Sequence, residues 1–366
     1  MGLYDALIAT YGDNVTIYCQ QHIPGMNLVT IHDRYAPHVK LVDYIGLQKE
    51  ALGWQRLPFR ELQHYDVVFI YGNPRLLSNV AASFYLKWRR TPVVIWGQAH
   101  TATANAASEA VRLRWWHCFH NFLVYNDKES EWLKAKGFNA HNVIGMNNGL
   151  DQKKIDAASH QWPVDRLAKW QSKSGLGKNQ LILSCARLVA KNRFEEAIDM
   201  LAQLVERGVD PIWAVIGDGP EKARLKKMAR SKGVAERIIW VGPVYDEDKL
   251  APWFLSADLF IHPSAIGLSL LHAMGYGLPV ITHSDREKQM PEFAAFIDGG
   301  TGLLFKPGEA ADFTCQTMAL LTQEDRRHQM GKTAQHIART LYNTDVMAQR
   351  FQQAAAFATS GKATVQ

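Results

Sequence analysis

The sequence predicts an α/β protein built from two doubly wound domains. Short runs of β-branched and aromatic residues recur along all 366 residues, and most are too apolar to be strands with one solvated face. Stretches with helical spacing and turn residues lie between them, an alternation that indicates parallel sheets with right-handed crossovers. The length suits two domains, each with its own core.

The expected strands fall into two series. The first lies at residues 15–18, 28–31, 67–70, 93–96 and 122–125, after a predicted first helix at residues 3–10. The second lies at residues 181–184, 212–216, 238–241, 259–261 and 280–282. A polar, lysine-rich stretch at residues 151–180, broken by Pro163, Gly175 and Gly177, separates the two series and is interpreted as the hinge region.

Composition excludes several classes of protein. The chain is 47% hydrophobic and 21% charged, which is typical of globular proteins and not of disordered or fibrous ones. No window approaches about 18 consecutive apolar residues, so no membrane-spanning helix is expected. The first 13 residues contain two aspartates and no basic segment, unlike a signal peptide, and we therefore expect a cytoplasmic protein.

Charge and cysteine usage narrow the range of ligands. The net charge of +6 is spread along the chain, which favours an anionic small molecule or an anionic membrane surface over nucleic acid. The four cysteines lie far apart without CxxC spacing, so neither a zinc site nor a disulfide framework is expected. The 14 histidines include no HExxH spacing, and no metal site is predicted.

Two cations follow the first strand of the second series. Arg187 and Lys191 stand between residues 181–184 and a predicted helix. Guanidinium and ammonium donors at a strand end can hold a diphosphate. Solvated surface charge on a loop is the alternative interpretation.

A glycine-rich turn follows the next strand. It contains Gly217, Asp218 and Gly219, and then Pro220, which we expect at the first position of a helix. The glycines permit a tight turn and the close approach of a ligand, and a helix N-terminus favours anions. An ordinary strand-to-helix turn is the alternative.

A third segment follows residues 259–261. A loop carries Gly267, and a helix is expected to start near Leu268. The backbone amides of Gly267, Leu268 and Ser269 would then face a phosphate. His272, one turn inside that helix, would lie within reach of a ribose.

Together these segments resemble the retaining, nucleotide-sugar-dependent glycosyltransferases of family 4, of the "glycosyl transferases group 1" type. The resemblance is carried, in the family's order, by ARLVAKNRF, VIGDGPE, ADLFIHPS, GLSLLHAMGYGLPVI, MPEF and DGGTGLLFKPGE. In the first half, NDKESEWLKAKGF followed by NVIGMNNGLD resembles the family's domain-closing segment. The resemblance implies the GT-B fold, in which two Rossmann-like domains face each other across a deep cleft.

The resemblance also implies roles for individual residues. Arg187 and Lys191 would hold the donor diphosphate, and the glycine-rich turn would line the same site. The loop at residues 267–269 would seat the distal phosphate and the sugar, while His272 would approach the ribose. His100, which ends the sequence WGQAH, would reach the transferred sugar from the first domain.

The chain departs from the family at the paired glutamates. The family usually has two, eight positions apart, and Ser264 and His272 stand at those positions here. Imidazole would then replace a carboxylate at the ribose. Glu292 of MPEF would supply another carboxylate, or it simply starts a helix. This variant resembles a subgroup of bacterial surface-polysaccharide synthesis, and Lys191 stands one residue from the family's usual lysine, where Asn192 is found.

A second departure lies at the N-terminus. Family members open with a strand and a glycine-rich loop, whereas this chain begins in a predicted helix. Either that first strand is missing or the first domain is built differently.

We expect an acceptor-binding domain over residues 1–160 and a nucleotide-sugar-binding domain over residues 161–344. A C-terminal helix at residues 345–366 would cross back to the first domain.

The function implied is sugar transfer with retention, without a cofactor or a metal. Asp246–Asp248 imitates the metal-binding DxD of a different glycosyltransferase fold, but a helix cap is the expected role. The basic and aromatic segments at residues 84–90 and 112–120 suggest a lipid-linked saccharide acceptor and peripheral membrane contact; core aromatics backed by solvated charge are the alternative. A GT-B nucleotide-sugar epimerase and a non-catalytic partner subunit remain open as alternatives.

Overall fold

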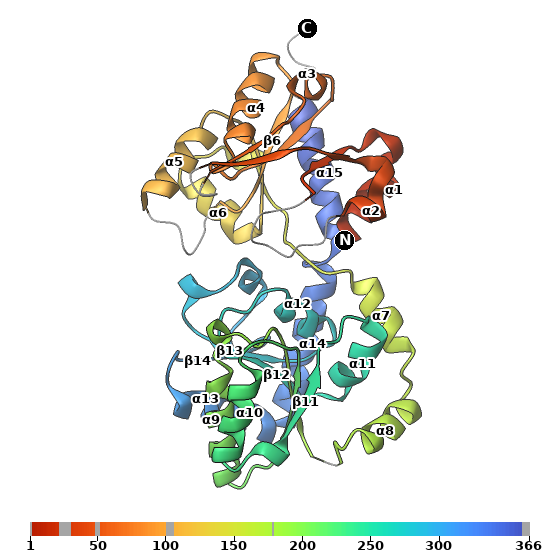
Figure 1. Ribbon diagram of the computed structural model, residues 1–366, viewed down its shortest axis with the longest axis vertical. Helices are drawn as coiled ribbons and strands as arrows, with labels where there is room; N and C mark the ends of the chain where they lie inside the picture. Colours follow the sequence, from red (N-terminus) through yellow and green to blue (C-terminus); the bar gives the residue numbers. More distant parts are fainter. Residues whose placement is uncertain (1, 22–30, 48–51, 100–105, 178, 361–366) are drawn as a thin grey trace. The chain divides into compact units, whose positions relative to one another are not determined.

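The chain folds into two compact units (Figure 1). The computed structural model describes residues 2–21, 31–47, 52–99, 106–177 and 179–360. Unit 1 combines Met1–Asn148 with Thr344–Gln366, and unit 2 is Gly149–Asn343. The chain therefore passes between the units twice, at residues 148–149 and again at residues 343–344.

Unit 2 is built on a six-stranded parallel sheet. The strand order is β11-β10-β9-β12-β13-β14. Successive strands are added in one direction from β9 to β11 and in the opposite direction from β12 to β14, so the order reverses between β9 and β12. This is the doubly wound arrangement expected from the sequence. The strands are β9 (Leu181–Cys185), β10 (Ile212–Ile216), β11 (Ile238–Gly242), β12 (Leu259–His262), β13 (Val280–His283) and β14 (Gly302–Phe305).

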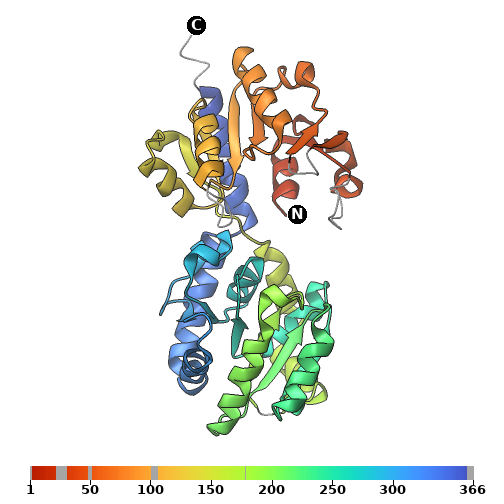
Figure 2. The ribbon, with the colours of Figure 1, turned by 60° about the vertical axis from the view of Figure 1, so that its left-hand side comes forward.

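Helices cover both faces of the unit 2 sheet (Figure 2). Alternate strand residues enter two separate cores, as in β9, where Leu181 and Leu183 belong to one core and Ile182 to the other. One face carries α7 (Gln152–His160), α8 (Val164–Lys173), α11 (Glu247–Ser256), α12 (Leu268–Gly275) and α14 (Glu324–Thr340). The other carries α9 (Phe194–Glu206), α10 (Lys222–Ser231) and α13 (Ala310–Thr322).

Two helices occupy the stretch at residues 151–180 that the sequence suggested as a hinge. Ile155 and Ala158 of α7 are buried in the core of unit 2. Trp170 of α8 packs edge-on against Trp253 of α11, with ring centroids 4.8 Å apart. The apolar residues of this polar stretch therefore find partners on unit 2.

Unit 1 contains a four-stranded parallel sheet with the order β5-β6-β7-β8, together with two smaller sheets. β1 pairs parallel with β2, and β3 pairs antiparallel with β4, so the first predicted strand does not join the main sheet. Residues 28–30, predicted as part of a strand, lie outside the described residues. The strands are β1 (Ile17–Cys19), β2 (Val39–Leu41), β3 (Tyr44–Leu47), β4 (Leu52–Gln55), β5 (Val68–Tyr71), β6 (Val93–Gly97), β7 (Asn121–Val124) and β8 (Val143–Gly145).

The last helix of the chain packs on unit 1. Met347 and Phe351 of α15 are buried in one core with Leu7, Val94 and Leu123. The helices of this unit are α1 (Gly2–Tyr11), α2 (His32–Tyr35), α3 (Phe59–Leu62), α4 (Leu77–Trp88), α5 (Ala106–Trp116), α6 (Asp127–Ala135) and α15 (Thr344–Ser360).

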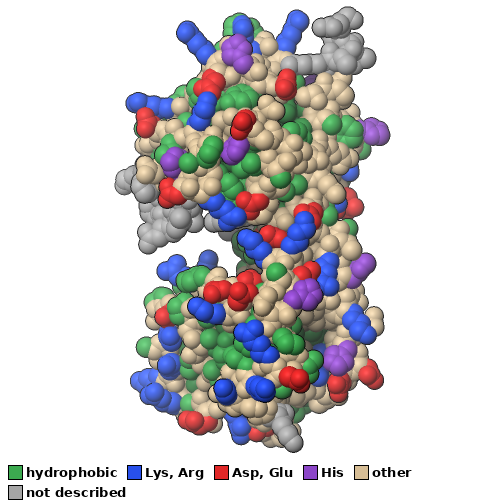
Figure 3. Space-filling view, turned by 90° about the vertical axis from the view of Figure 1, so that its right-hand side faces the viewer, with side chains coloured by type: hydrophobic (Ala, Val, Ile, Leu, Met, Phe, Trp, Pro, Cys, Tyr) green, Lys and Arg blue, Asp and Glu red, His purple; other side chains and the backbone are tan. Residues whose placement is uncertain are grey.

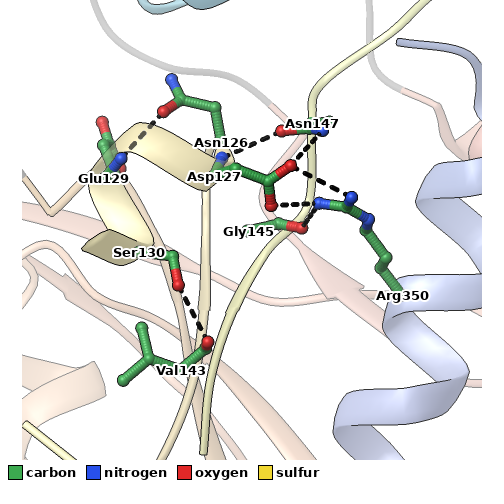
Figure 4. Close-up of polar contacts among 8 residues, drawn as sticks. All are labelled: Asn126, Asp127, Glu129, Ser130, Val143, Gly145, Asn147 and Arg350. Carbon is green, nitrogen blue, oxygen red and sulfur yellow. Dashed lines mark hydrogen bonds and ion pairs between the residues drawn. The ribbon is translucent and has the colours of Figure 1, made fainter. Parts of the chain in front are cut away.

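An ion pair ties α15 to Asp127, the first residue of α6 (Figure 4). The Arg350 guanidinium donates to both carboxylate oxygens of Asp127 and to the carbonyl oxygen of Gly145. Asn147 Nδ2 donates to Asp127 Oδ2 at 2.7 Å, and Asn147 Oδ1 accepts from the Asp127 amide at 2.9 Å. Asn147 has a φ of +53°, a left-handed conformation that asparagine tolerates. This network anchors α15 beside the segment that leads to unit 2.

Removing the guanidinium should loosen α15. We expect Arg350→Ala to destabilise its docking by about 1–2 kcal/mol, because the lost pair is half-exposed at Asp127 but several hydrogen bonds are lost together. Amide hydrogen exchange in α15 would be correspondingly faster. Gln352→Ala is the matched control on the same helix, since it removes one exposed hydrogen bond to Thr10. Wild-type exchange rates in the Arg350→Ala protein would contradict the anchoring role.

Charges of both signs are mixed over the surface. On the face seen in Figure 3, Lys and Arg side chains are interspersed with Asp and Glu on both units. Many cations of unit 2 are paired, as Arg224 is with Glu195 and Glu221. Within the described part of the chain, no helix is both long enough and apolar enough to span a membrane.

Candidate functional site

The candidate site lies at the carboxyl edge of the unit 2 sheet. Because the strands are parallel, the loops that follow them meet at one edge, and the order turns back between β9 and β12. Doubly wound sheets bind ligands at this point. The loops after β9, β10 and β12 carry most of the residues that the sequence singled out.

The loop after β9 presents two exposed cations. Arg187 stands two residues past the end of the strand, and Lys191 lies in the short 3₁₀ helix Ala190–Asn192. Asn192 Nδ2 donates to the carbonyl oxygen of Arg187 at 2.7 Å, which closes the loop on itself. Among the described residues, neither cation has an acidic group within ion-pair distance. Both are therefore available to an anion.

The glycine-rich turn after β10 packs directly against this loop. A Cβ on Gly217 would lie 2.0 Å from the carbonyl oxygen of Ala186, and one on Gly219 would lie 2.1 Å from that of Leu188. The Leu188 amide donates to the carbonyl oxygen of Asp218 at 2.9 Å. The glycines thus allow two backbone segments to touch, and the contact fixes the residues on either side of Arg187.

Two details of the turn differ from expectation or add to it. α10 begins at Lys222, so Pro220 precedes the helix and does not open it. The turn leaves β10 through a backbone contact with the neighbouring loop, and the helix starts only after that contact ends. Asp218 is exposed; its Oδ1 accepts from the Gly219 amide at 2.8 Å and lies 3.5 Å from Lys222 Nζ.

The loop after β12 leads to the N-terminus of α12. Gly267 stands at the cap position and α12 begins at Leu268, as predicted, with no side chain capping the first amides. Leu268 is exposed and Ser269 half-buried. These amides are consequently open to a ligand, and the helix dipole favours a negative charge there.

A buried glutamine that the sequence did not single out holds this loop. Gln289 Oε1 accepts from the Ile266 amide at 2.8 Å, and its Nε2 donates to the carbonyl oxygen of His283 at 2.9 Å. Ser264 is half-buried, and its carbonyl oxygen accepts from Thr282 Oγ1 at 3.3 Å. The loop after β12 is therefore locked to the end of β13.

Glu292 is brought to the same place from a different element. It is buried in the first turn of the 3₁₀ helix Pro291–Ala295. Its Oε2 lies 3.9 Å from the position that a Cβ on Gly267 would take. Glu292 therefore stands at a helix start, and its carboxylate lies beside the loop after β12.

His272 is engaged by a carboxylate that the sequence analysis assigned to a helix cap. Its Nε2 lies 2.8 Å from Glu247 Oε1, and the Tyr276 hydroxyl donates to the same oxygen at 2.7 Å. Burial alone would raise the pKa of Glu247, but the hydrogen bond and positive charge of His272 hold it below its usual value. Burial and the bond to Glu247 raise the pKa of the Tyr276 hydroxyl. Glu247 is therefore ionised and can only accept.

The acidic motif Asp246–Asp248 does cap α11. Asp246 Oδ1 accepts from the Asp248 amide at 3.1 Å, as expected for a helix N-terminus. Within the described ranges, no group of three or more His, Cys, Asp or Glu side chains is arranged to hold a metal ion. Burial raises the pKa of Cys185, at the end of β9, to about 11, and the charge of Glu247 adds to it.

His100 lies outside the described residues, but the residue before it is held on both sides. The Ala99 amide donates to Glu129 Oε2 at 2.9 Å, and its carbonyl oxygen accepts from Arg112 Nη1 at 3.0 Å. Both charged side chains are buried. Burial lowers the pKa of Arg112, and the charge of Glu129 acts in the opposite direction. The sequence analysis did not single out either residue.

A buried histidine beside the site predicts acid sensitivity. Burial lowers the pKa of His262 to about 4, and the charge of His283 acts in the same direction. The unfolded chain therefore binds a proton below about pH 6.5 that the folded chain binds only near pH 4, so stability falls as the pH falls through this window, by about 3 kcal/mol in total. Urea unfolding of His262→Gln should depend less on pH between 6.5 and 4 than that of the wild type. The exposed His160→Gln serves as control and should keep the wild-type slope; an equal slope in His262→Gln would contradict the assignment.

Comparison with known proteins shows which family unit 2 resembles. Residues 168–337 match the family model Glycosyl transferases group 1. The sulfoquinovosyl transferase SQD2 of Arabidopsis thaliana is 30% identical over 207 residues, which are 55% of this chain and 38% of that protein. A GDP-mannose-dependent alpha-(1-6)-phosphatidylinositol monomannoside mannosyltransferase of Mycolicibacterium smegmatis is 28% identical over 184 residues, 48% of this chain and 47% of that protein. The chain spans less than half the length of these two relatives.

The fold extends the likeness to both units. This chain is similar in structure to the crystal structure of Anabaena Alr3699/HepE in complex with UDP. The similarity covers 97% of this chain and 95% of that chain, with a TM-score of 0.73 and 16% sequence identity. At this identity the likeness concerns the fold, and it confirms the predicted GT-B class with two Rossmann-like domains. Within unit 2, residues 168–337 are similar to the glycosyl transferases group 1 family.

Proposed function

We propose that this protein is a retaining glycosyltransferase that moves a sugar from a nucleotide-sugar donor to a saccharide or lipid-linked saccharide acceptor. The observation that carries the proposal is the pair of exposed cations Arg187 and Lys191, which have no acidic partner among the described residues. The glycine-rich turn packs against their loop at the carboxyl edge of the sheet. Unit 2 would bind the donor and unit 1 the acceptor. The names of relatives support a nucleotide-linked donor, since one is described as GDP-mannose-dependent and a structural neighbour was crystallised with UDP.

The proposed chemistry needs electrostatic stabilisation of the leaving group. As the bond between the anomeric carbon and the phosphate oxygen breaks, negative charge grows on the diphosphate and positive charge on the sugar. Arg187 and Lys191 would stabilise the former without a metal, and the amides at Gly267–Ser269 would seat the distal phosphate. The acceptor oxygen attacks the same face, and the leaving phosphate oxygen takes its proton. His100 and Glu292 would contact the transferred sugar.

An exposed aromatic and basic surface on α4 supports a membrane-bound acceptor. Trp88 is 73% exposed and Phe84 43%, and the Arg89 guanidinium lies 5.4 Å from the Trp88 ring. Trp115 and Trp116 of α5 are buried, so the aromatic residues of the second segment belong to the core. We assign contact with the cytoplasmic face of a membrane to α4, in bacterial polysaccharide or glycolipid synthesis. Flotation with anionic vesicles tests this, and Trp88→Ala should float less.

Calorimetric binding of UDP-, GDP-, ADP- and dTDP-linked sugars, without added metal, tests the donor site. Micromolar binding of one nucleotide class supports the proposal and selects the donor for an acceptor screen. Release of nucleotide without any transfer to an acceptor would favour the epimerase. Failure to bind any of the donors would favour a non-catalytic partner subunit, which the absence of glutamate at Ser264 and His272 motivates.

A further inference from the structure

The two carboxylate oxygens of Glu247 differ in their hydrogen bonds. Glu247 Oε1 accepts from both His272 Nε2 and the Tyr276 hydroxyl. Among the described residues, Oε2 accepts no hydrogen bond, and the side chain remains 30% exposed. A carboxylate has about four acceptor positions, so this one is oriented by two donors and keeps capacity for more.

The two donors hold the carboxylate in one orientation. The His272 ring packs 4.4 Å from that of Phe254, and the Tyr276 ring packs 4.9 Å from the same phenyl group. Phe254 is fully buried, so these rings cannot move freely. His272 Nε2 must carry a proton, because an ionised carboxylate only accepts. That proton is already committed to Glu247, which leaves Nε2 unavailable to a ligand.

Glu247 lies at the same sheet edge as the exposed cations. Glu247 is the first residue of α11 and follows the loop after β11, and α11 packs against β9, which ends at Cys185. Arg187 follows Cys185 by two residues. A carboxylate near a phosphate-binding cation repels phosphate itself, but it accepts hydrogen bonds from the hydroxyl groups next to that phosphate. Acidic residues bind ribose hydroxyls in this way in other doubly wound domains.

We propose that Glu247 binds the ribose hydroxyls of the nucleotide and that His272 and Tyr276 are positioning residues that orient its carboxylate. This rests on the proposed function, because it assigns the ribose subsite of the same donor site. It replaces the direct contact between His272 and ribose that the family resemblance implied. The carboxylate missing from position 272 is supplied from α11, and the histidine holds it in place.

The sharpest test couples the side chain to the hydroxyl groups. Among UDP, GDP and ADP, the diphosphate that the wild type binds most tightly is compared with its 2′-deoxy and 3′-deoxy analogues by calorimetry. Loss of a hydrogen bond to a charged group should weaken binding about 10–100-fold. We expect the Glu247→Gln protein to bind the ribonucleotide more weakly than the wild type does, by this factor. One of the two deoxy analogues lacks the hydroxyl group that Glu247 binds, and the variant and the wild type should bind that analogue with the same affinity.

Matched variants separate recognition from structure. Asp248→Asn removes a charge from the same helix turn and should leave both affinities unchanged. In His272→Gln the pKa of Glu247 should rise, because His272 holds it down, so ribonucleotide binding should be lost at a higher pH than in the wild type. Tyr276→Phe should give a smaller shift of the same sign. Circular dichroism would confirm that each variant is folded.

The outcomes distinguish this inference from the proposed function. If the wild type binds none of the three diphosphates, the donor site itself is wrong and the ribose assignment falls with it. If the wild type binds one, but Glu247→Gln keeps the wild-type preference for ribose over deoxyribose, the donor site stands and the assignment to Glu247 is overturned. An equal loss for ribonucleotide and deoxy analogues would likewise overturn it, since the effect would then be structural.

Discussion

Replacing Arg187 by alanine is expected to weaken the binding of a nucleoside diphosphate by about 100-fold, the effect of losing two charge-assisted hydrogen bonds to phosphate. The guanidinium is exposed at the end of β9 and has no acidic partner among the described residues, so no existing ion pair has to break when phosphate binds. Its backbone is fixed by the glycine-rich turn and by Asn192. Little of the binding energy is therefore lost in ordering the loop.

Calorimetry on the wild type and four variants would test this. Arg187→Lys should recover part of the affinity, since an ammonium group keeps the charge and loses the bidentate geometry. Lys191→Ala should cost less, about tenfold, because it removes a single point charge. Arg230→Ala removes another exposed cation, from α10, and should bind like the wild type. Wild-type affinity in Arg187→Ala would rule out the diphosphate clamp, and a similar loss in Arg230→Ala would reduce it to a general charge effect.

The strands buried on both faces were predictable from the sequence, and the short ones were not. β10 was predicted with its observed bounds, and β9, β12 and β13 each differ by one residue. These strands are continuous apolar runs because helices cover both faces. β8 has three residues and β14 begins with glycine, so neither forms a run long enough to recognise. Their pairing comes from neighbouring strands already in place.

In the candidate site, residues within one short motif were predictable from the sequence, and contacts between distant elements were not. Arg187, Lys191 and the glycine-rich turn were recognised because each lies within one short motif beside a strand. Glu247 and His272 are 25 residues apart, and their contact depends on how α11 and α12 pack. Glu129 is 30 residues from Ala99, and it reaches that residue only because β6 and β7 are neighbours. No local pattern signals either contact, which is why Glu247 passed for part of a helix cap.

The glycine-rich turn should tolerate no side chain at Gly217. Its φ is +139°, where only glycine is comfortable, and a Cβ would lie 2.0 Å from a backbone oxygen that no rotamer change can move. We expect Gly217→Ala to destabilise unit 2 by about 3–5 kcal/mol, the range of severe core and backbone clashes. Hydrogen exchange of the β9 and β10 amides would report this loss. Because the displaced oxygen belongs to Ala186, the affinity for nucleoside diphosphate should fall as well.

Alanine variants of three glycines separate the effect of a positive φ from the effect of a clash at the Cβ position. Gly219 would clash with the carbonyl oxygen of Leu188 but has no positive φ, whereas Gly233 has a φ of +71° and open space around its Cβ position. All three alanine variants restrict the unfolded chain equally, so that contribution cancels in the comparison. Gly233→Ala should cost only the backbone strain, about 1–2 kcal/mol, and leave nucleotide affinity unchanged. Gly219→Ala should lower both stability and affinity, because its clash displaces the loop that carries Arg187. If Gly219→Ala and Gly233→Ala behave alike, close packing of the turn does not position Arg187, and the glycines serve only to turn the chain.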